Sequence, residues 1–232
     1  MVSFTTPKTS GKQPAYSVKK LTQPINTDAK WDKPQWQSIE AINLKNFMGD
    51  KPGFSPTVQA KMMYDDENIY VIFHVNDRFV RCTTKNINGS VSNDSCVELF
   101  FAPDTTFPLK YFNLETNCGG TVLMHYNTIP RKEVKKLDVE DIRKIEIAHS
   151  LPQIIDPEIK ERVTLTLEYK IPVELLRKYS NVTKPGPGII WKANFYKIAD
   201  KTSNSHYLTW AHVENNKPDF HLPQFFGILK FE

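Results

Sequence analysis

The sequence predicts an all-β protein, a single antiparallel β-sandwich of immunoglobulin-like or jelly-roll type with one short helix. Three observations support this prediction. Short strand-like runs recur from about residue 57 to the end, residues 163–172 (VTLTLEYKIP) alternate between apolar and polar positions, and only residues 173–180 (VELLRKYS) have a helical pattern. Many short strands with one helix are typical of a sandwich, and 232 residues is an ordinary length for a single such domain.

The predicted strands begin with a hairpin. Residues 57–65 and 68–77 are separated by the polar turn Asp65-Asp66-Glu67, and the run IYVIFHV is apolar on both faces, as expected inside a sandwich. Residues 1–21 are polar and punctuated by prolines, so we expect a loose lead-in there and a domain over residues 22–232. Further strands are expected at 96–103, 111–117, 121–127, around 145–147, 163–172, 191–200, 206–210 and 226–231.

The charge and composition exclude several classes of partner. The net charge of +4 is mild and the basic residues are scattered, so we expect no nucleic-acid partner. No stretch approaches the roughly 18 apolar residues that cross a bilayer, so we expect no membrane span. The first residues lack an apolar run suited to a secretion signal. Three cysteines (Cys82, Cys96 and Cys118) show no metal-binding spacing and allow at most one disulfide.

Signals for catalysis are weak. The sequence contains no GxSxG, HExxH, phosphate-binding loop or dinucleotide-binding glycine pattern. The strand carboxylates Glu98, Glu115 and Glu168 could hydrolyse a glycoside only if two of them converge, and outward strand positions commonly carry Glu. Met62 or Met63 with a distant histidine could ligate haem, although a strand Met more often fills the core. We therefore expect a protein that is not an enzyme.

Two polar strand residues are candidates for ligand contacts. By alternation, Glu98 shares a face with Cys96 and Phe100, and a carboxylate in so apolar a strand is costly if it is buried without a partner. That face is either a wet sheet surface or a site that offers Glu98 to a polar ligand. Asn117 is either a turn residue before Gly119-Gly120 or a donor and acceptor for a sugar hydroxyl.

The aromatic residues divide by their context. Sugar binding uses flat rings that stack on a pyranose, with a few polar groups that fix the hydroxyls. Trp191 and Trp210 lie inside strand patterns and are expected in the core. Phe220 lies in the proline-flanked loop NNKPDFHLP, where periodicity does not force burial, so it is the better candidate for a stacking platform.

These residues also occur in the pattern of a known protein family. The chain resembles the family 9 carbohydrate-binding modules, DOMON-like β-sandwiches, and more narrowly the uncharacterised bacterial family 9-like proteins. The resemblance covers about residues 22–232. The blocks that carry it, in the order of the family, are PINTDAKWDKPQW, YDDENIYVIFHVNDRFVR, DSCVELFF, YFNLETNCGGT, VTLTLEYKIPVELL, WKANFYKIADKTSNSHYLTW and PDFHLPQFFGILKF.

The resemblance implies a non-catalytic module that binds mono-, di- or oligosaccharide units, or polysaccharide ends, between two aromatic rings. Matched by motif, the acidic contact falls on Glu98, the strand-ending asparagine on Asn117, and one ring on Phe220, where a tryptophan is expected. The sequence departs from the pattern at the first ring, because NINGSVSNDS holds no aromatic residue. It departs again at Glu115, where the family has arginine.

Three further residues are candidates for polar contacts with a ligand. Arg78, Arg81 and His221 could supply polar contacts from loop positions. The resemblance leaves a structural calcium site open and suggests an extracellular or periplasmic location, while the lack of a signal sequence keeps a cytoplasmic location open. We expect no other cofactor and a monomer. The alternatives to sugar binding are a haem-binding DOMON-type redox domain and an interaction domain that has lost the sugar site.

Overall fold

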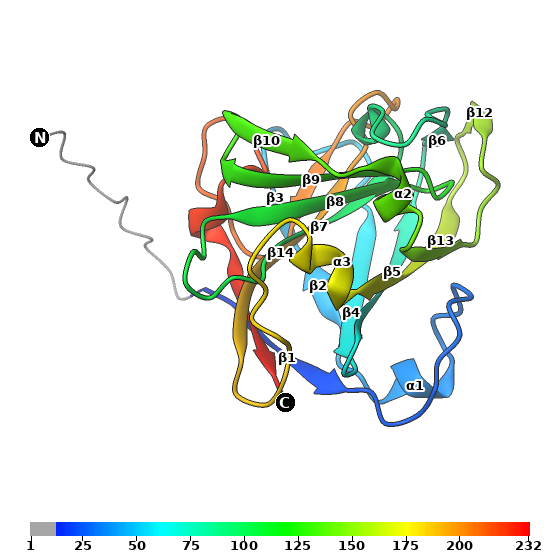
Figure 1. The fold of residues 1–232 in the computed structure, drawn as a ribbon. Coiled ribbons are helices and arrows are strands. Elements are labelled where there is room, and N and C mark those ends of the chain that lie inside the picture. Colours follow the sequence, from blue (N-terminus) through cyan, green and yellow to red (C-terminus); the bar gives the residue numbers. More distant parts are fainter. Residues whose placement is uncertain (1–12) are drawn as a thin grey trace, which may run out of the picture.

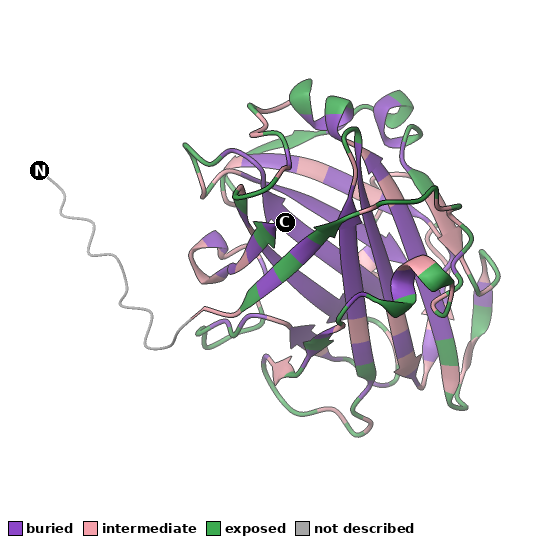
Figure 2. Ribbon diagram, turned by 90° about the horizontal axis from the view of Figure 1, so that it is seen from below, coloured by how far each residue is buried: buried purple, intermediate pink, exposed green. Residues whose placement is uncertain are grey.

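The computed structural model describes residues 13–232 and shows a β-sandwich, which confirms the predicted fold class (Figure 1). Two layers of strands pack face to face, and most of their length is buried (Figure 2). The main cluster of buried apolar side chains lies between the layers. The first twelve residues, which belong to the predicted lead-in, lie outside the described part of the chain.

The first layer carries the candidate site. Its strands run in the order β10-β9-β8-β7-β14-β16, with neighbours antiparallel. Short strands β15 and β3 extend it beside β14. The bounds are Asn46–Phe47 for β3, Cys96–Ala102 for β7, Tyr111–Asn117 for β8, Val122–Ile129 for β9, Glu133–Lys136 for β10, Ile190–Ile198 for β14, Tyr207–Thr209 for β15 and Gly227–Phe231 for β16.

The second layer runs in the order β4-β5-β13-β11, and β2 pairs with β4. The predicted hairpin turn at Asp65-Asp66-Glu67 joins β4 to β5. A separate two-stranded sheet, β6 with β12, lies at one end. The bounds are Ile42–Leu44 for β2, Thr57–Tyr64 for β4, Asn68–Asp77 for β5, Val80–Cys82 for β6, Glu146–His149 for β11, Ile155–Ile159 for β12 and Val163–Pro172 for β13.

Strand β1 (Ala15–Lys20) joins the two layers and corrects two expectations. Residues 15–18 pair with β16 and residues 19–20 pair with β4, both in parallel, so the sandwich is not wholly antiparallel. A segment expected to be a loose lead-in therefore contributes a strand. In this strand only Tyr16 and Val18 are buried, and two apolar positions in a short polar run give too weak an alternation to predict it.

Three short α-helices occur in residues 13–232, where the sequence predicted one. The predicted helix is α3 (Val173–Arg177), directly after β13. The other two, α1 (Pro34–Gln37) and α2 (Val139–Ile142), have four residues each. A single turn is too short to show a helical period, which explains why the sequence pattern did not reveal them.

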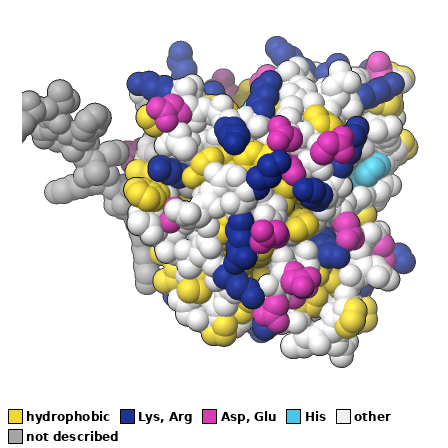
Figure 3. Space-filling view, viewed as in Figure 1, with side chains coloured by type: hydrophobic (Ala, Val, Ile, Leu, Met, Phe, Trp, Pro, Cys, Tyr) yellow, Lys and Arg dark blue, Asp and Glu magenta, His cyan; other side chains and the backbone are white. Residues whose placement is uncertain are grey.

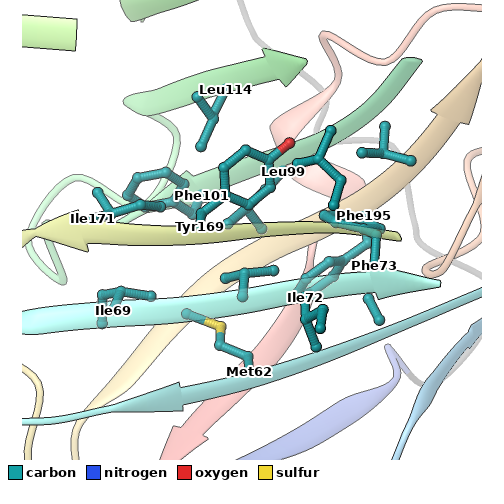
Figure 4. Close-up of a cluster of buried hydrophobic side chains, with 14 of the residues drawn as sticks. Met62, Ile69, Ile72, Phe73, Leu99, Phe101, Leu114, Tyr169, Ile171 and Phe195 are labelled. Atoms are coloured by element: carbon teal, nitrogen blue, oxygen red, sulfur yellow. The ribbon is translucent and has the colours of Figure 1, made fainter. Parts of the chain in front are cut away.

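The core fills the space between the layers. Phe195 of the first layer and Phe73 of the second meet with their ring centroids 5.9 Å apart (Figure 4). Trp191 is buried in this core, as predicted, while Trp210 is half-buried and packs against its margin. Met62 lies among the same side chains (Figure 4), where it fills the core, so the packing does not favour the haem alternative.

A buried ion pair also crosses between the layers. Lys197 of β14 and Asp77 of β5 are both fully buried, with Lys197 Nζ 3.1 Å from Asp77 Oδ2. His206 completes the group: its Nδ1 donates to the carbonyl of Asn204 at 2.6 Å, and its Nε2 accepts from Lys197 Nζ at 2.8 Å. Burial, with the nearby ammonium, lowers the pKa of His206 to about 3, which keeps the ring neutral.

The outer face of the second layer is covered by residues 21–40, which are held by Glu168 of β13. One oxygen of this buried carboxylate accepts from the backbone N–H groups of Asp28 and Ala29, each at 2.9 Å, and from Lys33 Nζ at 2.8 Å. The other oxygen accepts from Trp36 Nε1 at 2.9 Å. Glu168 therefore anchors this segment, and it lies far in the fold from the carboxylates of the first layer.

The surface carries mixed charge. On the face shown in Figure 3, Lys and Arg side chains are interspersed with Asp and Glu side chains. Within residues 13–232, no helix is long and apolar enough to cross a membrane.

Candidate functional site

The candidate site lies on the outer face of the first layer. The alternation predicted for β7 is confirmed, because Val97, Leu99 and Phe101 belong to the central core while Cys96 and Phe100 belong to a second apolar cluster. That second cluster is covered by the loop that precedes β16. It consists of Met48, Val91, Cys96, Phe100, Ala102, Tyr111, Tyr196, Ile198, Val213, Phe220 and Phe226.

A small pocket opens beside this second cluster. Its volume is about 200 Å³, smaller than the about 300–1,000 Å³ of sites for drug-sized ligands. Acidic, basic and aromatic side chains meet in it. The lining residues are Ser92, Glu98, Phe100, Glu115, Arg131, Ile198, Tyr207, Pro218, Asp219, Phe220 and His221. A pocket of this size and chemistry suits one small polar ring, and we call it the acidic pocket.

Two carboxyl groups form its floor. Glu98 of β7 lies directly opposite Glu115 of β8, so the pairing of the strands places them side by side. Their residues are 2% and 8% exposed. Asn113 Nδ2 donates to Glu115 Oε1 at 2.9 Å, whereas the hydrogen bond found for Glu98 is a long one from Cys96 Sγ at 4.0 Å. Glu98 thus retains acceptor capacity toward the pocket.

Burial changes the protonation of this pair. Burial raises the pKa of Glu115 to about 7, although the hydrogen bond from Asn113 and the charge of Arg131 act in the opposite direction. Burial and the neighbouring Glu115 raise the pKa of Glu98 well above its usual range. Near neutral pH the pair therefore holds at least one proton, and it can both donate and accept hydrogen bonds.

His221 and its neighbours form one wall. The phenol of Tyr111 lies 2.8 Å from His221 Nδ1, and the His221 ring lies 5.0 Å from that of Phe100. Burial and the charge of Arg131 lower the pKa of His221 to about 4, so the ring is neutral at physiological pH. Asp219 holds this wall in place. Its carboxylate accepts from the backbone N–H of His221 at 3.0 Å and from Arg131 Nη2 at 2.6 Å.

Phe220 reaches the acidic pocket but is mostly packed. It is 6% exposed, and one face of its ring stacks on Tyr196 at 4.1 Å between centroids with the planes 14° apart. Tyr196 also donates its hydroxyl proton to the Phe220 carbonyl at 3.1 Å. The ring of Tyr207 meets Phe220 edge-on at 6.3 Å. Packing against Tyr196 and Tyr207 therefore fixes the Phe220 ring, and at most one of its faces is directed to the acidic pocket that it lines.

The structure does not bring Asn117 to the pocket. Its amide nitrogen donates to the Thr84 carbonyl at 2.9 Å and to Asp94 Oδ2 at 3.0 Å, and its oxygen accepts from the Thr121 N–H at 2.9 Å. The hairpin turn that follows needs Gly120, whose φ is +85°. The amide of Asn117 is thus engaged in holding the turn between β8 and β9.

The two arginines expected near the site also lie elsewhere. Arg78 Nε donates to the Lys160 carbonyl at 3.0 Å, and its guanidinium lies over the Phe79 ring at 4.9 Å. Arg81 Nη1 lies 3.8 Å from Asp94. Neither lines the acidic pocket. Of the six residues selected from the sequence, the pocket combines three: Glu98, Phe220 and His221.

Sequence reasoning did not select several residues that line the pocket. Arg131 lies in the turn between β9 and β10 with a φ of +60°, and it approaches the site only because that turn folds over Asp219. Tyr207 comes from β15. No local pattern marks such contacts between distant segments, whereas Asp219 could have been selected as the acidic neighbour of Phe220 in the loop.

The described residues give little support for a bound metal. Within residues 13–232, no group of three or more His, Cys, Asp or Glu side chains is arranged to hold an ion, and the three cysteines are buried free thiols. The carbonyl of Asn26 and the carboxylates of Asp28 and Glu168 do converge, but on the ammonium of Lys33. A cation is therefore already present at that oxygen cluster, as part of the chain.

A larger groove lies at a second place, between β1 and residues 38–46. Its volume is about 570 Å³. Trp210 lines it together with Tyr16, Glu40 and Asn46, and Tyr16 spans part of it by donating to the Glu40 carbonyl at 2.9 Å. The groove offers an aromatic ring with lysine, serine and asparagine side chains, but it has no buried carboxyl group without a close partner like Glu98.

Comparison with known proteins places this chain in a family. The family model described as Carbohydrate-binding family 9 matches residues 24–231. A crystal structure of a putative carbohydrate-binding protein from Bacteroides uniformis is similar at 26% identity and a TM-score of 0.84, over 95% of this chain and 100% of that one. No curated protein matches the sequence significantly.

Two more distant structures share the fold. A family 9 module from Caldicellulosiruptor kristjanssonii in complex with cellotriose has 15% identity and a TM-score of 0.64, over 94% of each chain. The same kind of module from that organism in complex with glucose has 14% identity and a TM-score of 0.63, over 94% of this chain and 96% of the other. The family match over nearly the whole sequence and the shared sandwich lead to one conclusion: this chain belongs to carbohydrate-binding family 9.

Proposed function

We propose that this protein binds carbohydrate in the acidic pocket and does not chemically convert it. The observation that carries the proposal is a small pocket in which buried carboxyl groups meet aromatic rings, in a chain of family 9. Sugars need these two features together, because hydroxyl groups require donors and acceptors while the C–H faces of the ring require apolar surface.

Each side of the pocket would contact a different part of the sugar. Glu98 and Glu115 would exchange hydrogen bonds with neighbouring hydroxyl groups, since near neutral pH the pair holds both a donor and acceptors. The free face of Phe220 would cover the apolar side of the ring, with Tyr207 at its edge. His221 and Arg131 would complete the polar rim.

The arrangement of the carboxyl groups favours binding over hydrolysis. Glycosidases place their two carboxyl groups so that they flank the scissile bond. Glu98 and Glu115 occupy opposite positions of adjacent strands on one face of the sheet, so they would contact a sugar from the same side. We therefore assign them to recognition, and we expect no release of reducing sugar from a panel of chromogenic glycosides.

Glu98→Ala should weaken sugar binding about tenfold or more, because it removes a buried group whose hydrogen bonds to the ligand are worth roughly 1.5–3 kcal/mol. Alanine is the informative substitution, since glutamine would imitate the protonated carboxyl group. The measurement is isothermal titration calorimetry with mono- and oligosaccharides, including glucose and cellotriose.

The matched control is Glu174→Ala, which alters a glutamate whose side chain is 83% exposed in α3. It should bind sugar as the native chain does. The proposal fails if the native chain binds none of the sugars, or if Glu98→Ala binds them with unchanged affinity while remaining folded.

A further inference from the structure

The carboxyl pair lacks a cation of its own. In the described part of the chain, Glu98 and Glu115 form no ion pair, and their hydrogen bonds come from Cys96 and Asn113, which are neutral. Two carboxyl groups that lie side by side in a buried place repel one another once both are ionised. The pair is therefore a place where a positive charge would be stabilised.

Two positive groups, Arg131 and Lys197, act on the pair through their charge, but neither forms an ion pair with it. On β14, Lys197 points to the opposite face of the sheet and is paired with Asp77. At the rim, Arg131 is paired with Asp219 at 2.6 Å. Each of these two positive charges thus already has an acidic partner.

Two histidines are neutral near pH 7: His221, which lines the pocket, and His125, which lies opposite Asn113 in the pairing of β8 with β9. Burial and nearby positive charges lower the pKa values of His221 and of His125, on β9, to about 4 each. Neither ring therefore adds a positive charge. Among the lining residues Arg131 is paired with Asp219 and His221 is neutral, so the lining of the acidic pocket is net negative whenever its carboxyl pair loses a proton.

We infer that the acidic pocket recognises a sugar that carries an ammonium group, such as a 2-amino-2-deoxyhexose, with the ammonium placed at Glu98 and Glu115. The inference rests on the proposed carbohydrate function and names the ligand class for the same site. An ammonium group has three donors, enough to bond both carboxylates, and its charge removes the repulsion between them. A hydroxyl group at the same position has one donor and no charge.

The pH dependence of binding follows from the same pair. Because the pKa of Glu115 is about 7, lowering the pH protonates a carboxylate that an ammonium group would use. At and below about pH 7 most of an amino sugar carries its ammonium proton, so its affinity should fall as the pH decreases from about 7 to about 5.5, and binding in this range should release protons. The two histidines titrate below this range and would not mask the effect.

The test compares glucosamine with glucose, which differ at one position by an ammonium group in place of a hydroxyl group. In calorimetric titrations of the full chain at about pH 7, where most of the glucosamine carries its ammonium proton, glucosamine should bind about tenfold more tightly than glucose. Glu115→Gln keeps the shape of the side chain but removes its charge, so it should reduce this preference to near unity. Proton release is read from titrations in buffers of different ionisation enthalpy.

The outcomes separate this inference from the function on which it rests. In one outcome, the native chain binds glucosamine and glucose with equal affinity, and Glu98→Ala binds neither. That result would overturn the amino-sugar inference but would support carbohydrate binding in the acidic pocket. A preference for glucosamine that survives Glu115→Gln and does not change with pH would also overturn it. If neither these sugars nor oligosaccharides bind, both proposals fail.

Discussion

Replacing Lys197 by methionine should lower the free energy of unfolding by about 3–5 kcal/mol, because breaking a buried ion pair leaves the other charge without a partner. Asp77 is fully buried, and Lys197 Nζ is the positive group 3.1 Å from its carboxylate. In the native chain burial and the Lys197 ammonium hold the pKa of His206 at about 3, so the neutral ring does not share the charge role of Lys197. Chemical denaturation followed by intrinsic fluorescence measures the loss.

Two controls separate charge from packing. Lys230→Met, at an exposed position of β16, should change the stability by less than about 0.5 kcal/mol. The double variant Asp77→Asn with Lys197→Met removes both charges and should recover most of the lost stability. If Lys197→Met is as stable as the native chain, the ion pair between Lys197 and Asp77 does not hold the two layers together.

Glu168→Ala should cost about 3 kcal/mol and should loosen residues 21–40 before the rest of the chain unfolds. The substitution leaves Trp36 Nε1 and the Ala29 N–H, both buried, without their acceptor, and each buried unpaired group costs roughly 1–3 kcal/mol. Lys33 also loses the carboxylate that lies 2.8 Å from its ammonium. Hydrogen exchange should reveal faster exchange at Ala29 in the variant.

The prediction is tested by where in the chain hydrogen exchange accelerates in the Glu168→Ala variant. Hydrogen exchange in β7 and β8 should remain slow, because Glu168 contacts the covering segment on the opposite layer of the sandwich. Sugar affinity should also be unchanged at temperatures where the variant is folded. Uniform acceleration throughout the chain, or native exchange at Ala29, would contradict the anchoring role of this carboxylate.

The parts of the fold that the sequence predicted are those with a strong local period. The alternation in residues 163–172 predicted β13, and the polar turn between two apolar runs predicted the β4–β5 hairpin. Strand β1 was missed because its pairing depends on β16, more than two hundred residues later in the chain. Parallel pairing with so distant a strand produces no pattern in the residues around β1.

Two residues of the site could be predicted because their neighbours in the sequence are unusual for their type. A carboxyl group amid apolar neighbours indicated that Glu98 would be unusual, and proline-flanked Phe220 indicated a constrained loop. Asn117 shares the polar side of β8 with Glu115, but it lies at the strand end, where the turn uses its amide. Arg131 could not be found, because its approach depends on how one turn folds over a distant loop.

The measurement that most directly tests the central claim is a nuclear magnetic resonance titration of the native chain with glucosamine, glucose and cellotriose. The account predicts that backbone amide shifts change in β7, in β8 and at residues 218–221, and that residues 38–46 are unaffected. Shift changes confined to the groove beside Trp210, or no changes with any of the three sugars, would contradict it.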